Sequence, residues 1–161
     1  MNISKKMQDA FNAQIVAEMW SSNLYLQMSC WFRKEGWKGF SGWMYKQAEE
    51  ERQHAMDMAQ FVLHRGGEVI LTSIDAVKTS WTDAKEAFVD TFAHEQKVTE
   101  LINKLADVAD EEKDLASQNF IAKYIDEQVE EEKNVKDILD SFAHLESHAI
   151  AHIDSKLEQA R

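Results

Sequence analysis

Apolar residues recur every three or four positions along most of the chain, which is the spacing of one face of an α-helix. The chain contains no proline and only five glycines, so the two residues that most often interrupt helices are nearly absent. We therefore predict an all-α fold in a single domain of residues 1–161. The pattern predicts four long helices and a short fifth, at about residues 4–33, 40–65, 83–110, 115–144 and 147–159.

Glycines mark both ends of the second predicted helix. Gly36 and Gly39 lie in the segment that separates it from the first helix and suit a short reversal between antiparallel neighbours. We expect the second helix to begin at about residue 40 or 41, with Ser41 as a plausible N-cap. The Gly66-Gly67 pair supplies the left-handed residue that commonly ends a helix.

The connection between the second and third predicted helices is unusually long. It runs from Glu68 to Thr82, is rich in β-branched residues and has no helical period. Hairpins in helical bundles need only about 2–8 residues, whereas about fifteen extended residues at about 3.3 Å each can travel the length of a bundle. We therefore expect a four-helix bundle of two antiparallel hairpins joined by this crossover, with the fifth helix added at the carboxyl end.

Charge and cysteine content narrow the partners and the compartment. The formal net charge of -11 argues against nucleic acid and against an anionic membrane surface, since both need clustered Lys and Arg. No stretch approaches the roughly 20 consecutive apolar residues of a membrane-spanning helix. The lone Cys30 cannot form an intrachain disulfide, and the amino terminus lacks the pattern of a signal peptide. These features predict a soluble, cytoplasmic protein.

Each long helix places an acidic residue within its otherwise largely apolar, inward-facing stripe. On the second helix, Glu51 and His54 follow the same alternating steps of three and four as Met44 and Met58. The corresponding acids on the first, third and fourth helices are Glu18, Glu95 and Glu131.

The acidic positions also repeat along the chain. The pair Glu18 and Glu51, 33 residues apart, returns 77 residues later as Glu95 and Gln128. Members of each pair lie about equally far from their helical reversal, so we expect all of them at one level of the bundle. Several carboxylates cannot share a dry site as bare anions, because burial and mutual repulsion would protonate them unless cations compensate. The pattern therefore predicts a pair of metal ions.

This arrangement resembles that of ferritin-like di-iron proteins, which offer a Glu from each of two helices and Glu-x-x-His from each of the other two. The second motif departs from that pattern, because it reads Gln128-x-x-Glu131. One metal position is then offered His54 and the other only oxygen ligands. We expect an asymmetric and partly labile pair.

More closely, the chain resembles the bacterial non-haem ferritins over essentially its full length, through Glu18, the stretch EEERQH at 49–54, Glu95 and the stretch EQVEE at 127–131. The resemblance implies a ferroxidase that oxidises Fe(II) with O2 or peroxide. It also implies a hollow homo-oligomer of 24 subunits that stores ferric mineral. One iron is implied at Glu18, Glu51 and His54, and a second at Glu51, Glu95 and Glu131, with Gln128 alongside and Glu51 bridging both ions.

The same resemblance implies a third, adjacent iron position. Its ligands correspond to Glu50, Glu127 and Glu130, with Glu131 shared. A tyrosine near the metal pair corresponds to Tyr25.

Three related families fit less well. Bacterioferritins hold haem with a methionine directly after the bridging glutamate, and here that position is Arg52, so no haem is expected. Rubrerythrin-type di-iron peroxidases normally add a cysteine-ligated iron module, which one cysteine cannot build. Small Dps-type cages place their ligands between subunits and lack the fifth helix. An iron-storage cage without fast oxidation stays open, although the retained ligand set argues against it.

Some of these residues have simpler readings. Runs of glutamate at 49–51 and 130–132 are, taken alone, typical of solvated helix faces. His144, His148 and His152 recur every fourth residue, and we interpret them as an exposed polar face rather than a metal-binding or channel-lining stripe.

Overall fold

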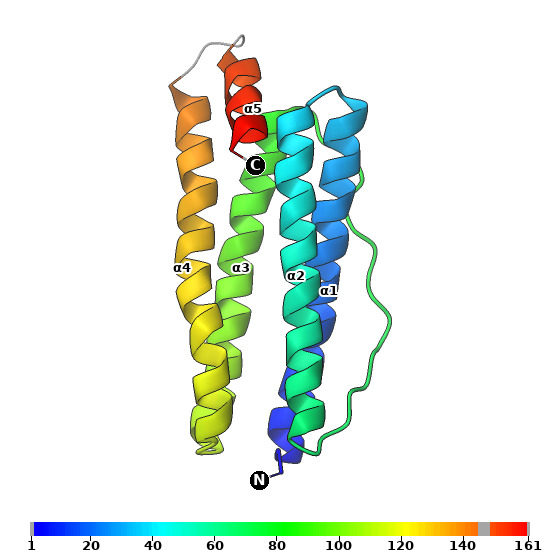
Figure 1. Ribbon diagram of the computed structural model, residues 1–161, viewed down its shortest axis with the longest axis vertical. Coiled ribbons are helices and arrows are strands. Elements are labelled where there is room, and N and C mark those ends of the chain that lie inside the picture. Colours follow the sequence, from blue (N-terminus) through cyan, green and yellow to red (C-terminus); the bar gives the residue numbers. More distant parts are fainter. Residues whose placement is uncertain (1, 145–148, 161) are drawn as a thin grey trace.

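The computed structural model describes residues 2–144 and 149–160, and this part of the chain is entirely helical apart from loops and turns (Figure 1). The predicted all-α class is therefore confirmed. Four long helices form an elongated bundle, and a short fifth lies against one end. The helices are α1 (Lys5–Lys34), α2 (Lys38–His64), α3 (Ala84–Glu111), α4 (Leu115–Ala143) and α5 (Ile150–Gln159).

The chain path agrees with the predicted topology. Helices α1 and α2 form one antiparallel hairpin and α3 and α4 form the other, while the crossover runs the length of the bundle beside the first hairpin (Figure 1). Side-chain amides of α1 hold the start of the crossover in place. Asn12 Nδ2 donates to Glu68 O at 3.0 Å, and Gln8 Oε1 accepts from Glu68 N at 2.8 Å. These contacts satisfy backbone groups that have no helix partner.

Local signals set most helix ends as expected. Ser4 Oγ accepts from Met7 N at 3.1 Å, and Asp83 Oδ1 accepts from Glu86 N at 2.8 Å, so both residues cap a helix amino end. Gly66 has a φ of 71°, which is the left-handed conformation that follows α2.

The start of α2 differs from the prediction. The helix begins at Lys38, and Ser41 is not its N-cap. A Cβ atom on Gly39 would lie 1.8 Å from the backbone oxygen of Asp154, so the absent side chain lets α5 approach α2. Asp154 Oδ1 then accepts from Phe40 N at 2.8 Å, which satisfies a free amide of the first turn. A partner from the far end of the chain therefore replaces the local cap.

The carboxyl-terminal prediction is only partly covered by the described residues. Helix α5 spans Ile150–Gln159, and the predicted start at 147 lies outside them, as does His148. His144 and His152 are both exposed, in agreement with a polar face.

Two apolar clusters fill the bundle, one toward each end. Both contain packed aromatic rings, with Phe32, Phe40 and Phe88 in one and Phe11 against the partly buried Phe61 in the other. The buried carboxylates lie on the turns of the long helices that separate these two clusters. No helix of the described residues is long and apolar enough to cross a membrane.

Candidate metal centre

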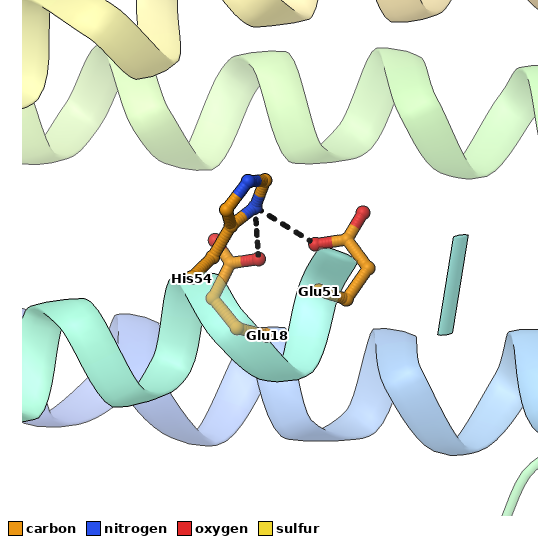
Figure 2. A group of neighbouring side chains, drawn as sticks. All are labelled: Glu18, Glu51 and His54. Carbon is orange, nitrogen blue, oxygen red and sulfur yellow. Dashed lines mark ion pairs between the residues drawn. The ribbon is translucent and has the colours of Figure 1, made fainter. Parts of the chain in front are cut away.

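Glu18 on α1 and Glu51 and His54 on α2 meet in the middle of the bundle (Figure 2). One ligand atom from each lies within 4.8 Å of the others. His54 Nδ1 is 3.4 Å from Glu51 Oε2 and 3.8 Å from Glu18 Oε2. Glu18 and Glu51 are 2% and 4% exposed, so their carboxylates are almost fully shielded from water. The fold thus brings together two acidic residues that are 33 positions apart in the sequence.

Helix geometry explains how these side chains converge. Glu51 and His54 are three residues apart on α2 and therefore share one face. Helix α1 is held against α2 close by, where Ser22 Oγ donates to Ala48 O at 2.7 Å. Glu18 lies one turn before Ser22, which directs its carboxylate toward the same face.

Carboxylate oxygens in this cluster lack hydrogen-bond donors. Among the described residues, Glu18 Oε2, Glu51 Oε2 and Glu127 Oε2 are buried atoms without a hydrogen-bond partner. The ring nitrogens of His54 lie 3.3–3.8 Å from these oxygens. Native proteins give the great majority of buried polar atoms a hydrogen bond, and a buried carboxylate oxygen without one is costly. A cation bound among Glu18, Glu51 and His54 would satisfy the Glu18 and Glu51 oxygens, and mixed oxygen and imidazole ligands suit a divalent transition metal.

The titration properties of the cluster show strong coupling between its members. Burial, with the charge of Glu18, raises the pKa of Glu51 well above its usual value. Burial also acts to raise the pKa of Glu18, but polar contacts with Glu51, His54 and Gln14 lower it overall. Burial opposes the charge on His54, yet contacts with both glutamates raise its pKa to about 10. The raised pKa values of Glu51 and His54 favour their protonated forms, and binding of a cation here would compete with those protons.

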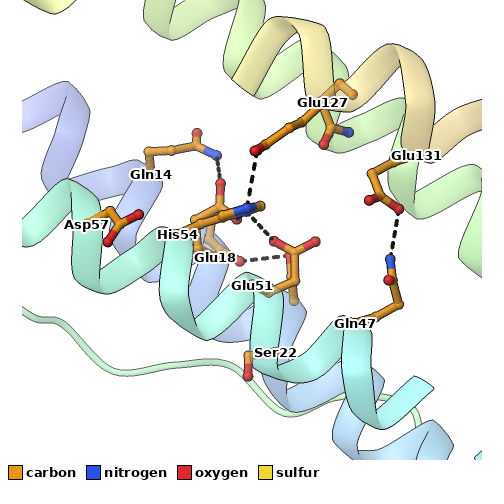
Figure 3. Close-up of polar contacts among 12 residues, drawn as sticks. Gln14, Glu18, Ser22, Gln47, Glu51, His54, Asp57, Glu127 and Glu131 are labelled. Carbon is orange, nitrogen blue, oxygen red and sulfur yellow. Dashed lines mark hydrogen bonds and ion pairs between the residues drawn. The ribbon is translucent and has the colours of Figure 1, made fainter. Parts of the chain in front are cut away.

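Glu95 and Glu131 have a different environment. Glu95 on α3 is fully buried and accepts hydrogen bonds from Tyr25 OH and, at 3.1 Å, from Gln128 Nε2. Burial raises the pKa of Glu95 to about 7. Glu131 on α4 accepts from Gln47 Nε2 at 2.8 Å (Figure 3), and burial raises its pKa as well. These carboxylates are therefore held by side-chain donors of the protein.

The remaining predicted ligands lie nearer the surface. Glu127 reaches inward, with its Oε2 3.3 Å from His54 Nε2, although its side chain is 46% exposed (Figure 3). Glu50 lies 3.6 Å from Lys46 Nζ on α2, and Glu130 is exposed on α4. The structure brings Glu127 to the buried cluster, places half-buried Glu50 in a surface pocket that Gln47 and Glu131 also line, and leaves Glu130 exposed.

Comparison with known proteins agrees with this geometry. The sequence-family model of the ferritin-like domain matches residues 8–145 of this chain. The chain belongs to the ferritin family. A bacterial non-heme ferritin of Bacteroides fragilis is 46% identical over 157 residues, which are 98% of this chain and 99% of that protein. A probable bacterial non-heme ferritin-like protein of Haemophilus influenzae is 36% identical over 86% of this chain and 84% of its own length.

Solved ferritin structures show the same fold. An open pore ferritin from Archaeoglobus fulgidus superposes with a TM-score of 0.94 and 41% sequence identity, covering 97% of this chain and 98% of that one. The predicted family is therefore confirmed at the level of sequence and of fold.

Two supporting residues of this ferritin-family centre were not assigned a role from the sequence. Gln14 Nε2 donates to Glu18 Oε1 at 2.7 Å, and Gln47 Nε2 donates to Glu131 Oε2. Gln14 precedes Glu18 by one helical turn, a spacing that could have revealed the contact. The hydrogen bond from Gln47 on α2 reaches Glu131 on α4, which is 84 positions later in the sequence, so no local pattern predicts it.

Proposed function

We propose that this chain oxidises Fe(II) at a di-iron ferroxidase centre and stores the Fe(III) product as mineral inside an oligomeric cage. The buried cluster of Glu18, Glu51 and His54, with two carboxylate oxygens lacking donors, is the observation that carries the proposal. The relatives named as non-heme ferritins support the same activity.

Fe(II) enters the centre as a substrate. One ion binds Glu18, Glu51 and His54, and a second binds Glu51, Glu95 and Glu131 beside Gln128, so that Glu51 bridges the two. Binding displaces the protons held by Glu51 and His54. Each ion then gives one electron to the oxidant. With O2, two electrons and two protons produce H2O2; with H2O2, they produce two molecules of water.

Negative oxygen ligands favour oxidation, because their attraction to a triply charged ion exceeds that to a doubly charged one. Glu131 is partly exposed and reaches the second position from α4, so its coordination is expected to be the more labile. We propose that Fe(III) leaves by a third position formed by Glu50, Glu127 and Glu130, with Glu131 shared. Tyr25, hydrogen-bonded to Glu95, would orient that ligand.

Storage requires an oligomeric assembly that surrounds a hollow space. We propose a homo-oligomer, with 24 subunits as the expected number, in the cytoplasm. The strong similarity to the Archaeoglobus fulgidus ferritin supports such an assembly. No haem is expected as a cofactor.

Two other functions would predict different iron chemistry. A storage cage without fast oxidation would accumulate iron no faster than a variant lacking the centre. A rubrerythrin-type peroxidase would consume peroxide without retaining a ferric core.

Aerobic iron loading of the wild type beside Glu51→Ala and His54→Ala tests the proposal, with Glu49→Ala as an exposed control on the same helix. Initial rates are followed at the ferric absorption band, and particle size and retained iron are measured afterwards. We expect rapid oxidation in the wild type and the control only. Equal rapid oxidation in all four proteins would contradict the site, and released iron would contradict storage.

A further inference from the structure

Tyr124 on α4 has a buried hydroxyl for which the described residues offer no hydrogen-bond partner. The side chain is 2% exposed. A buried phenol normally donates to an acceptor, and native structures leave few such groups unpaired. The hydroxyl is therefore free to donate to an acceptor outside the described residues.

The four buried side-chain atoms that lack a hydrogen-bond partner among the described residues all belong to residues that contact His54. Three are acceptors, namely Glu18 Oε2, Glu51 Oε2 and Glu127 Oε2, and Tyr124 OH is the only one able to donate. A cation can satisfy the carboxylates, but it cannot satisfy an O–H donor. The Tyr124 hydroxyl therefore needs a separate acceptor beside the cation, such as a water molecule or a small anion.

The Tyr124 ring is positioned directly against the candidate metal ligand His54. The ring centroids are 5.1 Å apart and the planes are at 81°, an edge-to-face contact. A phenol is protonated at neutral pH, so the hydroxyl is available as a donor.

Neighbours on α4 hold the ring without using its hydroxyl. Lys123 Nζ lies 4.6 Å from the centroid of the Tyr124 ring, and the Phe120 ring is 5.5 Å away. Tyr25 differs, because its hydroxyl is already donated to Glu95. Of the two buried tyrosines near the centre, only Tyr124 has a free proton to offer.

We propose that Tyr124 donates a hydrogen bond to the water or small anion that completes the coordination of the cation held by Glu18, Glu51 and His54. This inference rests on the proposed function, since it needs a cation at that position. Such a donor would orient an incoming oxygen ligand and stabilise negative charge that develops on it.

The test uses the assembled full-length protein and the change Tyr124→Phe, which removes the hydroxyl and keeps the ring contacts. Tyr45→Phe on the exposed face of α2 is the matched control. Co²⁺ is titrated without O2 and followed by its visible absorption, and azide is then titrated as a small anionic ligand. Initial rates of Fe(II) oxidation are measured in parallel.

We expect Tyr124→Phe to keep the Co²⁺ dissociation constant within about twofold, because Tyr124 is not a metal ligand. Azide affinity and the oxidation rate should each fall about tenfold, the size expected for one hydrogen bond to a charged group. Tyr45→Phe should match the wild type in all three measurements. The azide titration is decisive.

Unchanged azide affinity in Tyr124→Phe would overturn the inference while leaving the proposed function intact. A Co²⁺ affinity that falls as far as the azide affinity would also overturn it, since Tyr124 would then act by holding the carboxylates. Failure of the wild type to bind Co²⁺ would refute the metal centre and this inference together. Cobalt binding without Fe(II) oxidation would contradict the ferroxidase proposal alone.

Discussion

The two hairpins of the bundle carry related acidic residues but satisfy them differently. In the first hairpin, Glu18 and Glu51 each keep one buried oxygen without a hydrogen bond, at 3.8 and 3.4 Å from His54 Nδ1. In the second, Glu95 accepts hydrogen bonds from Tyr25 and Gln128. The internal repeat of the sequence therefore places similar carboxylates at similar heights in two unlike environments.

This difference bears on how each half would accept a cation. In the first hairpin, a cation relieves unsatisfied oxygens and replaces shared protons, so binding there removes an existing cost. In the second, binding must disturb hydrogen bonds that already satisfy Glu95 and Glu131. We therefore expect tighter binding in the first hairpin and weaker, exchangeable binding in the second.

The largest effect is expected from Glu51→Gln, which alters the residue proposed to bridge both ions. Removing a residue that supports a metal ligand without touching the metal typically lowers metal affinity or activity by about 10–100-fold. Loss of a ligand shared by both ions should therefore slow initial Fe(II) oxidation at least about 100-fold. Stopped-flow absorbance measures this rate. Glu49→Gln, the same change on the exposed face, should oxidise iron like the wild type. A rate for Glu51→Gln within threefold of the wild type would remove the distinction between the hairpins.

A smaller effect is expected from Glu131→Gln in the second hairpin. The variant should bind its first Co²⁺ as tightly as the wild type and oxidise Fe(II) about tenfold more slowly, because only the weaker position is affected. Calorimetric titration resolves the two binding steps. Loss of the first step in this variant would mean that the two positions are not separable.

The pH dependence of metal-free stability should also distinguish the hairpins. The pKa of His54 is raised to about 10 from an unfolded value near 6.5, so its contribution is complete below about pH 6.5 and is lost as pH rises toward 10. Burial raises the pKa of Glu95 to about 7, so Glu95 lowers the stability of the folded protein as pH rises from about 4.5 to 7. Burial lowers the pKa of His94 to about 4, so His94 raises that stability over much of the same range.

Thermal unfolding of the chelator-treated protein between pH 7 and 10 therefore reports on the first hairpin. We expect the melting temperature to fall across this range, and to fall less in His54→Gln. An equally steep fall in His54→Gln would assign the effect to other groups.

The smallest effects are expected from the amides that support each half. Gln14→Ala should weaken the first binding step, and Gln47→Ala the second, each by about tenfold at most, because each amide supports a metal ligand without contacting the ion. The same calorimetric titration serves for both. Weakening of the same step by both changes would show that the supports are shared.

The helices, and the shared height of Glu18 and Glu51 in the bundle, could be predicted from the sequence, because helical periodicity and residue spacing can be read directly along the chain. Glu18, Glu51 and His54 could be grouped since each lies on an inward stripe, and the 33-residue spacing placed them at one height. Contacts between distant segments could not be predicted in this way. The start of α2 depends on Asp154 meeting Gly39, and the environment of Glu131 depends on Gln47 across the bundle.

The outer acidic residues show a further limit of the sequence pattern. Glu50, Glu127 and Glu130 were grouped through family resemblance, yet Glu127 alone turns toward His54. Side-chain direction at a half-exposed position depends on which neighbours compete for it, and Lys46 attracts Glu50 along its own helix. Spacing on a helix does not record that competition.

The order in which the two positions fill is the most direct test of the account. Crystals of the metal-free protein would be soaked anaerobically with one and then two equivalents of Fe(II) per subunit, and the ions located by anomalous diffraction. We predict density first among Glu18, Glu51 and His54, and a second ion near Glu51, Glu95 and Glu131 only at the higher loading. Equal occupancy at one equivalent, or iron first at Glu95 and Glu131, would contradict it.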